Sequence, residues 1–347
     1  MTALPWIDWD AAEQVGLELV DPGPRVGRPE RAQIVTQLRE QARRAADLLV
    51  EASGLPEVGE ARELVVDRRN IIRANVATAR RLTSESIGVA DSPLEAAAGR
   101  ARGATIGGAL AVVGTRILGQ FDPFAETPTL YLVAPTILAV ERGLRVNPTD
   151  FRMWVTLHEQ THRVQFANAP WLRDHLIGQL RVIVEADDEP FWHDLSQRLE
   201  QIRRDKTAGR PVSLRLINAF SSPDVAAAMD EVTAVMSLLE GHADLMMDRA
   251  GRSVIPSVAT IRARFDARRT KGGVHGLINR LLGMDAKLAQ YADGASFCRH
   301  VMRRGGTGLL NRAFEGPQWL PTLTELLDPE QWCRRLTSPA EDADGQA

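Results

Sequence analysis

The sequence contains few cysteines, tyrosines, histidines and lysines. Its 347 residues include two cysteines, two tyrosines and seven histidines, and its lysines are Lys206, Lys271 and Lys287. Two cysteines are too few for a disulfide framework or for a zinc site built from paired cysteines. Cys298 and Cys333 are therefore predicted to be buried or half-buried thiols. Because histidine is rare, any clustering of histidines is informative.

The sequence also lacks long apolar runs and a large net charge. No uncharged apolar stretch reaches the roughly 18 residues of a membrane span, and the start, MTALPWIDWD, does not have the pattern of a secretory signal. We therefore expect a cytoplasmic protein with no membrane partner. The 42 basic and 45 acidic residues leave a formal charge of −3, which provides no strong field for binding nucleic acid.

The composition that remains is typical of a globular, mainly helical protein. Apolar residues make up 44% and charged residues 25%, which is enough to build a core. At about 150 residues per domain the length predicts roughly two domains, or one large domain with an appended helical layer. Apolar spacing predicts helices over residues 10–20, 29–52, 69–82, 150–168, 187–205 and 224–250, and short strands over residues 64–66 and 129–134.

One glycine-rich stretch needs separate treatment because glycine also forms phosphate-binding loops. Residues 93–118 are rich in alanine and glycine, but they lack the Lys-Ser/Thr ending of a nucleotide-binding loop and a preceding strand. We therefore predict that their small side chains allow close helix packing.

The strongest chemical signal lies in a helix that begins near residues 147–150, with Thr149 or Asp150 expected as N-cap. Within it, His158-Glu159-Gln160-Thr161-His162 has the spacing H-E-x-x-H. Residues four apart lie above one another on a helix, so His158 and His162 present both imidazoles to one point, where Zn²⁺ would accept two nitrogens at about 2.0–2.1 Å. Glu159 lies beside the first ligand, where it would reach a water that the metal activates.

A catalytic zinc needs a third protein ligand. The extended motif with a further glycine and a third histidine is excluded, because Gln165 and Asn168 stand at those positions. A later helix with the sequence MSLLEGHADLMMD offers Glu240, and Asp244 lies four residues on, on the same face. We predict that Glu240 is the third ligand and that Asp244 accepts the other ring N–H of His158 or His162.

Several alternatives to this ligand set remain open. His242 lies on the same helix but is rotated by about 200° from Glu240, and His175 is a more distant choice. The helix that carries Glu240 could also be an ordinary amphipathic helix without a ligand. Donors for an oxyanion could be Tyr291, His275 or His242, although a tyrosine such as Tyr291 more often packs its ring and exposes its hydroxyl.

Several segments together resemble a known family. They are HEQTHRVQF, LLEGHADLMMDRAG, IRARFDARR, LLGMDAKLAQYADGASF and LPTLTELLDPEQW, with similar stretches near the N-terminus. The sequence resembles the zincin-like metallopeptidase family of high-GC bacteria, whose members are often labelled as hydrolases or as associated with deazaflavin-coenzyme biosynthesis. The resemblance implies a zincin-like core and one zinc ion, but no particular substrate. Matched by motif, His158, His162 and Glu240 correspond to the ligands and Glu159 to the catalytic base.

With this resemblance, the predicted fold class is mainly α (α+β), with a zincin-like core, a small sheet and additional packed helices. We predict an N-terminal helical region over residues 1–120, a metal-binding core with C-terminal helices over 121–337 and a frayed tail over 338–347. One continuous domain over residues 1–337 is the alternative.

The expected function is that of a zinc-dependent metallopeptidase or related amide hydrolase acting on a peptide or amide. The strand over residues 129–134, if it edges the cleft, could pair with an extended peptide backbone. The competing hypotheses are a non-catalytic zinc protein whose cleft binds a protein or peptide, and a metal-independent scaffold. Glu159 favours catalysis, because a structural site would use four protein ligands and would need no adjacent carboxylate.

The remaining charged residues give weaker signals. A basic cluster over residues 262–271 is predicted to be a solvated or salt-bridged face, and Asp248 is expected to pair with a local arginine. His193 and His300 are expected on helix surfaces.

Overall fold

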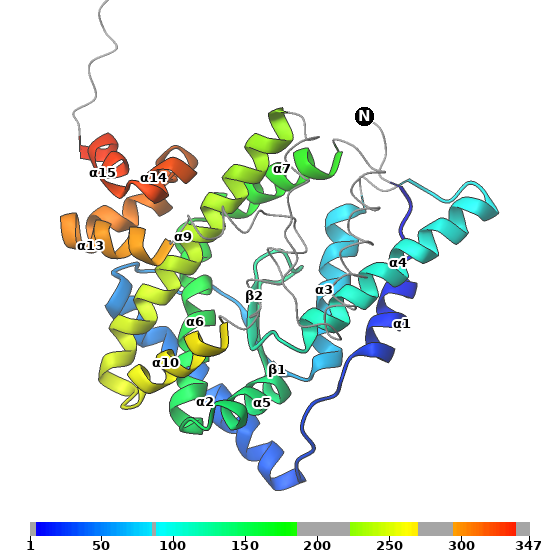
Figure 1. Ribbon diagram of the computed structural model, residues 1–347, viewed down its shortest axis with the longest axis horizontal. Coiled ribbons are helices and arrows are strands. Elements are labelled where there is room, and N and C mark those ends of the chain that lie inside the picture. The colour runs from blue at the N-terminus through cyan, green and yellow to red at the C-terminus, as the bar shows by residue number, and fades with distance from the viewer. Residues whose placement is uncertain (1–4, 85–87, 186–222, 270–293, 338–347) are drawn as a thin grey trace, which may run out of the picture.

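The computed structural model describes residues 5–84, 88–185, 223–269 and 294–337, and it shows a mainly helical protein with one small sheet (Figure 1). The predicted fold class of mainly helical structure with a small sheet is thus confirmed. The helix predicted over residues 187–205 lies outside the described residues. Within the described part of the chain, no helix is both long enough and apolar enough to cross a membrane.

The helices follow the predicted ranges closely where a range was given. α5 and α7 were not predicted, and the C-terminal helices were predicted without bounds. The helices of the first half are α1 (Trp9–Leu19), α2 (Arg28–Ser53), α3 (Arg68–Thr83), α4 (Pro93–Gly114), α5 (Ala134–Leu144), α6 (Pro148–Asn168) and α7 (Trp171–Glu185). Those of the second half are α9 (Pro223–Val254), α10 (Val258–Arg269), α13 (Gly294–Asn311), α14 (Leu323–Leu327) and α15 (Pro329–Thr337), with short 3₁₀ turns at Arg312–Phe314 and Pro317–Trp319.

The sheet has the strand order β1-β3-β2. β1 (Arg62–Val66) runs parallel to β3 (Thr129–Val133), and β2 (Gly119–Asp122) runs antiparallel to β3. The strand predicted over residues 129–134 is therefore the central strand, and the expectation that it edges a cleft is wrong. Its apolar residues are buried on both faces, as expected for a central strand. The edge beside it belongs to β2, whose sequence GQFD contains residue types that are rare in strands.

Two groups of buried side chains hold the molecule together. The main core joins α2, β3, α6, α9, α13 and α15, whereas a smaller cluster of Val20, Ile72, Val76 and Ala111 lies among α1, α3 and α4. Figure 1 shows α1, α3 and α4 on one side of the sheet and α6 and α9 on the other. Because α2 and β1 belong with the main core, the N-terminal segment is divided between the two clusters, and the boundary near residue 120 stays a prediction.

The predicted helix packing of the glycine-rich stretch is confirmed. Gly99, Gly103 and Gly107 lie one turn apart on α4 and face α1. A Cβ atom on Gly103 would overlap the backbone oxygen of Asp8, and one on Gly107 would overlap that of Ala12. The two helix backbones thus approach more closely than any larger side chain would allow.

The start of α6 differs slightly from the prediction. The helix begins at Pro148, and the N-cap is Asn147, whose Oδ1 accepts a hydrogen bond from the Asp150 backbone N–H at 3.1 Å. The expectation of Thr149 or Asp150 as N-cap is therefore wrong. Proline is favoured at the first helical position because it has no N–H to satisfy, which moves the cap to the residue before it.

Buried polar contacts fix the orientation of α6 about its axis. Arg152 donates to both carboxylate oxygens of Glu141 on α5, at 3.0 and 2.6 Å, and both side chains are buried. On another face, the Gln160 amide donates to the Ala42 carbonyl of α2 at 2.9 Å and to Glu63 of β1 at 3.0 Å. An unpaired charge or amide here would be costly. The helix is therefore held from several sides, and its remaining face points toward α9.

Candidate metal centre

Three side chains from α6 and α9 converge at one point. The Nε2 atoms of His158 and His162 are 3.2 Å apart, and the two Glu240 oxygens lie 3.4 Å from His158 Nε2 and 3.7 Å from His162 Nε2. The three side chains retain 22%, 13% and 27% of their exposure. The structure thus brings together the three ligands predicted from the sequence and leaves them partly accessible to a small molecule.

The spacing of these three donors fits a tetrahedral metal. Two ligand atoms that each lie about 2.0–2.1 Å from a tetrahedral zinc are about 3.3–3.4 Å from each other. The two imidazole nitrogens, 3.2 Å apart, are close to that value. Each Glu240 oxygen lies at a similar distance from one of them, Oε2 at 3.4 Å from His158 and Oε1 at 3.7 Å from His162. Two imidazoles and one carboxylate also form a donor set typical of zinc sites that keep one position open. The residues present therefore fit Zn²⁺.

The far ring nitrogens of both histidines have their own partners. Nδ1 of His162 lies 2.9 Å from Oε1 of Gln165, and Nδ1 of His158 lies 3.1 Å from Sδ of Met247. When Nδ1 carries the proton and donates it to these atoms, the lone pair of each Nε2 points toward Glu240. The contacts thus orient both imidazoles for binding a cation.

Gln165 continues this chain of contacts into the core. Its Nε2 donates to the Leu239 carbonyl at 2.8 Å and lies 3.0 Å from Nδ1 of His242. His242 is fully buried, and burial, together with the nearby charges of His162 and Arg249, lowers its pKa to about 3. A neutral His242 therefore accepts the Gln165 hydrogen bond.

The alternative ligands lie apart from the three donors. Nδ1 of His242 lies 3.0 Å from the Gln165 amide, and its ring packs against Phe314 with centroids 5.1 Å apart. His175 lies 3.0 Å from a Glu231 oxygen on α9. Among the candidates that the structure describes, Glu240 is the one that joins the two motif histidines.

Asp244 influences the site through its charge. Its carboxylate lies 3.9 Å from Arg262, which pairs with Asp248 at 2.8 Å as predicted for that residue. The Nδ1 atoms that Asp244 was expected to hold face Met247 and Gln165 instead. Burial by itself would lower the pKa of His158, but the hydrogen bond and charge of Glu240, with added effects from Glu159 and Asp244, raise it to about 9. The same negative field favours a metal cation.

Glu159 is buried beneath the edge strand of the sheet. Its exposure is 6%, and a Cβ atom placed on Gly119 of β2 would lie 2.5 Å from its Cγ and 2.8 Å from its Cδ. A glycine at position 119 therefore makes room for this carboxylate. β2 is held against α6 by ring contacts, with the Phe121 and Phe166 centroids 5.9 Å apart. The predicted base thus follows the first metal ligand along α6 and packs against an edge strand.

Three residues that shape this site were not predicted. Gln165 follows His162 by one helical turn, so its spacing could have indicated a contact with that ring. Met247 and Gly119 carry no such signal, because only packing between distant segments brings them to the site. The proposed oxyanion donors Tyr291 and His275 lie outside the described residues.

A mainly helical fold that presents two histidines and two glutamates in this arrangement is typical of metal-dependent hydrolases. The family model of the zincin-like metallopeptidases matches residues 7–333, and the chain belongs to this family. A solved structure from Chloroflexus aurantiacus, described as that of a candidate hydrolase with a novel fold, is similar to it at 28% identity and a TM-score of 0.68. The alignment covers 96% of this chain and 99% of that one. A comparison with curated proteins found no match.

Proposed function

We propose that the protein is a zinc-dependent peptidase or related amide hydrolase, in which His158, His162 and Glu240 hold one zinc ion. The observation that carries the proposal is the convergence of these donors at near-tetrahedral spacing. A buried carboxylate, Glu159, stands next to the first ligand. Membership of the zincin-like metallopeptidase family supports the same class of reaction.

In the proposed reaction, different residues of the chain hold the metal, transfer the proton and orient the ligands. Bound zinc would supply a Lewis acid that polarises the substrate carbonyl and makes water more acidic. Glu159 takes a proton from the attacking water and passes it to the amine nitrogen as the C–N bond breaks. The water oxygen becomes part of the new carboxylate. Gln165 and Met247 keep the two ligand imidazoles oriented throughout.

The edge strand β2 offers a binding place for the substrate. It is the outer strand next to β3 and lies directly beside Glu159. An extended peptide would add to the sheet along this edge through backbone hydrogen bonds, which bind the main chain without requiring a particular side chain. The scissile carbonyl would then lie near Glu159 and the metal ligands. This arrangement favours a peptide over a small compact amide.

The decisive experiment separates the base from the ligands. Glu159→Gln should keep the bound zinc and lower turnover of a peptide library by about 10²–10⁴-fold, because only the proton-transferring group is lost. His162→Ala should lose both zinc and turnover. Glu126→Gln, an exposed glutamate in the turn after β2, is the matched control and should behave like wild type.

Two results would contradict the proposal. Unchanged turnover in Glu159→Gln would show that Glu159 is not the base. Absence of bound zinc from the wild-type protein would rule out a zinc-dependent reaction. Zinc binding without turnover on any peptide or amide would favour the alternative of a non-catalytic zinc protein.

A further inference from the structure

A second group of metal-binding side chains lies between the C-terminal helices. His300 on α13 and Glu330 and Cys333 on α15 each offer one donor atom, and these atoms all lie within 4.8 Å of one another. Nε2 of His300 is 3.3 Å from Oε2 of Glu330. We propose that these three residues form a second zinc site, which joins α15 to α13.

The donor set identifies the metal. Imidazole, carboxylate and thiolate are all zinc ligands, whereas Mg²⁺ and Ca²⁺ prefer oxygen donors throughout. The separation of 3.3 Å between Nε2 of His300 and Oε2 of Glu330 matches the edge of a tetrahedral zinc site. The sulfur of Cys333 lies within 4.8 Å of both atoms. A thiolate and a carboxylate together neutralise the dication. Three protein ligands would leave the fourth position to water.

The surrounding contacts leave the ligand atoms available. Arg304 lies 3.7 Å from Oε1 of Glu330, so it engages the oxygen that His300 does not. Cys333 is buried. Binding of zinc would replace the proton of its thiol: Cys–SH and Zn²⁺ give a Cys–S–Zn bond and a released H⁺.

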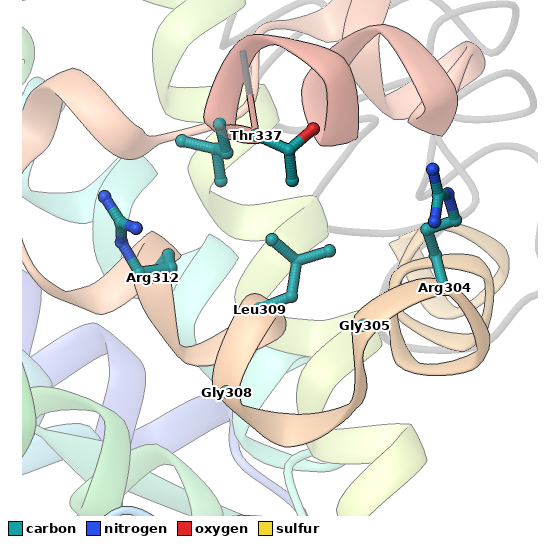
Figure 2. A pocket seen from close by; sticks show the side chains of 7 residues that line it. Arg304, Gly305, Gly308, Leu309, Arg312 and Thr337 are labelled. Carbon is teal, nitrogen blue, oxygen red and sulfur yellow. The ribbon is translucent and has the colours of Figure 1, made fainter. Parts of the chain in front are cut away.

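The location shows which elements the ion would join. α13 packs against α9, the helix that carries Glu240, and Gly294 and Gly241 lie at the closest approach of the two backbones. One turn beyond the ligands, a hollow of about 340 Å³ separates α13 from the end of α15. Figure 2 shows Arg304 and Arg312 on either side of Leu309 in this hollow, with Thr337 opposite. A metal between His300 and Cys333 would hold the two helices together beside this gap.

Cobalt substitution tests the second site independently of the first. The proposed ligands of the first site include no thiolate, so a thiolate-to-Co²⁺ charge-transfer band in the near ultraviolet reports on the second site. We expect the band in the full-length wild-type protein and in Cys298→Ser, the matched variant of the other buried cysteine. Cys333→Ser should abolish it, and His300→Ala should weaken it by lowering cobalt affinity. Zinc content should fall from about two ions per chain to about one in Cys333→Ser.

The outcomes distinguish this proposal from the proposed function. His162→Ala should keep the charge-transfer band while losing one zinc, because it removes only the first site. Absence of the band in wild type, or its persistence in Cys333→Ser, would overturn the second site and leave the first untouched. If Cys333→Ser does not fold, His300→Ala provides the test, because His300 is partly exposed and its replacement should be tolerated. Unchanged cobalt affinity in His300→Ala would refute the proposal.

Discussion

At the scale of single residues, the metal centre depends on side chains that do not bind the metal. Gln165 hydrogen-bonds a ligand imidazole, a backbone carbonyl of α9 and the buried His242. Gly119 contributes only the absence of a side chain beside Glu159. Both residues act through geometry, so replacing them should disturb the site without removing a ligand.

Replacing Gln165 should weaken zinc binding. Gln165→Ala removes the acceptor that orients His162, and loss of such a contact typically costs about 10–100-fold in metal affinity. Competition with a fluorescent zinc chelator, in a Cys333→Ser background that isolates the first site, measures the change. Gln14→Ala, at an exposed glutamine on α1, is the control. Unaltered affinity would show that Gln165 does not position His162.

Replacing Gly119 should slow catalysis while zinc remains bound. The added methyl group of Gly119→Ala would displace the Glu159 carboxylate, and a shift of about 1 Å can lower kcat by about 10²-fold. Gly108→Ala is the control, because a Cβ atom there meets no other group within 4 Å. Steady-state kinetics and zinc analysis of both variants check the prediction, and equal kcat values would contradict it.

At the scale of elements, polar contacts hold the short helices α14 and α15 in place. α14 begins with a capping box, in which Thr322 and Glu325 hydrogen-bond each other's backbone N–H groups. Arg335 of α15 donates to both Glu325 oxygens, at 2.6 and 3.0 Å. Burial would raise the pKa of Glu325, but the hydrogen bonds from Arg335 and Thr322 and the charge of Arg335 lower it below its usual value.

This lowered pKa predicts a pH-dependent contribution to stability. A carboxylate whose pKa is lower in the folded than in the unfolded protein stabilises the fold above its unfolded pKa, and the contribution is lost as the pH falls through the folded pKa. Glu325→Gln should therefore reduce the free energy of unfolding by about 1–3 kcal/mol at neutral pH. The difference from wild type should shrink in acid. Urea unfolding of the variant and the wild type at neutral and at acid pH measures this difference. A difference that does not change with pH would contradict the prediction.

At the scale of the whole molecule, the metal links two segments that are far apart in the sequence. His158 and His162 belong to α6 and Glu240 to α9, and both helices lie in the main core. A ligand that binds only the folded state stabilises it by about 2.7 kcal/mol at a concentration 100 times its Kd. Zinc should therefore raise the melting temperature of the full chain.

Metal removal provides the corresponding measurement. A chelator should lower the Tm of wild-type protein, and added zinc should restore it. The double variant His162→Ala, Cys333→Ser lacks a ligand at each proposed site, so its Tm should not respond to either treatment. A chelator effect of the same size in the double variant would show that the stabilising metal lies elsewhere.

The sequence by itself determined what depends on neighbours along the chain. Helical periodicity is set by local backbone hydrogen bonds, so the H-E-x-x-H spacing already placed both histidines on one face. It also indicated the close packing of α4 and the position of the strand β3 along the chain. The choice of Glu240 needed chemical reasoning about ligands, because no local rule specifies which distant carboxylate faces α6.

Only the tertiary structure decided which distant residues meet. The packing of α9 on α6 placed Met247, rather than Asp244, against the ring of His158. Pairing with β3 made a strand of residues that have little strand preference of their own and set Gly119 beside Glu159. Packing of α15 against α13 brought Cys333 close to His300. Such contacts arise from the burial of many side chains at once, which no short stretch of sequence encodes.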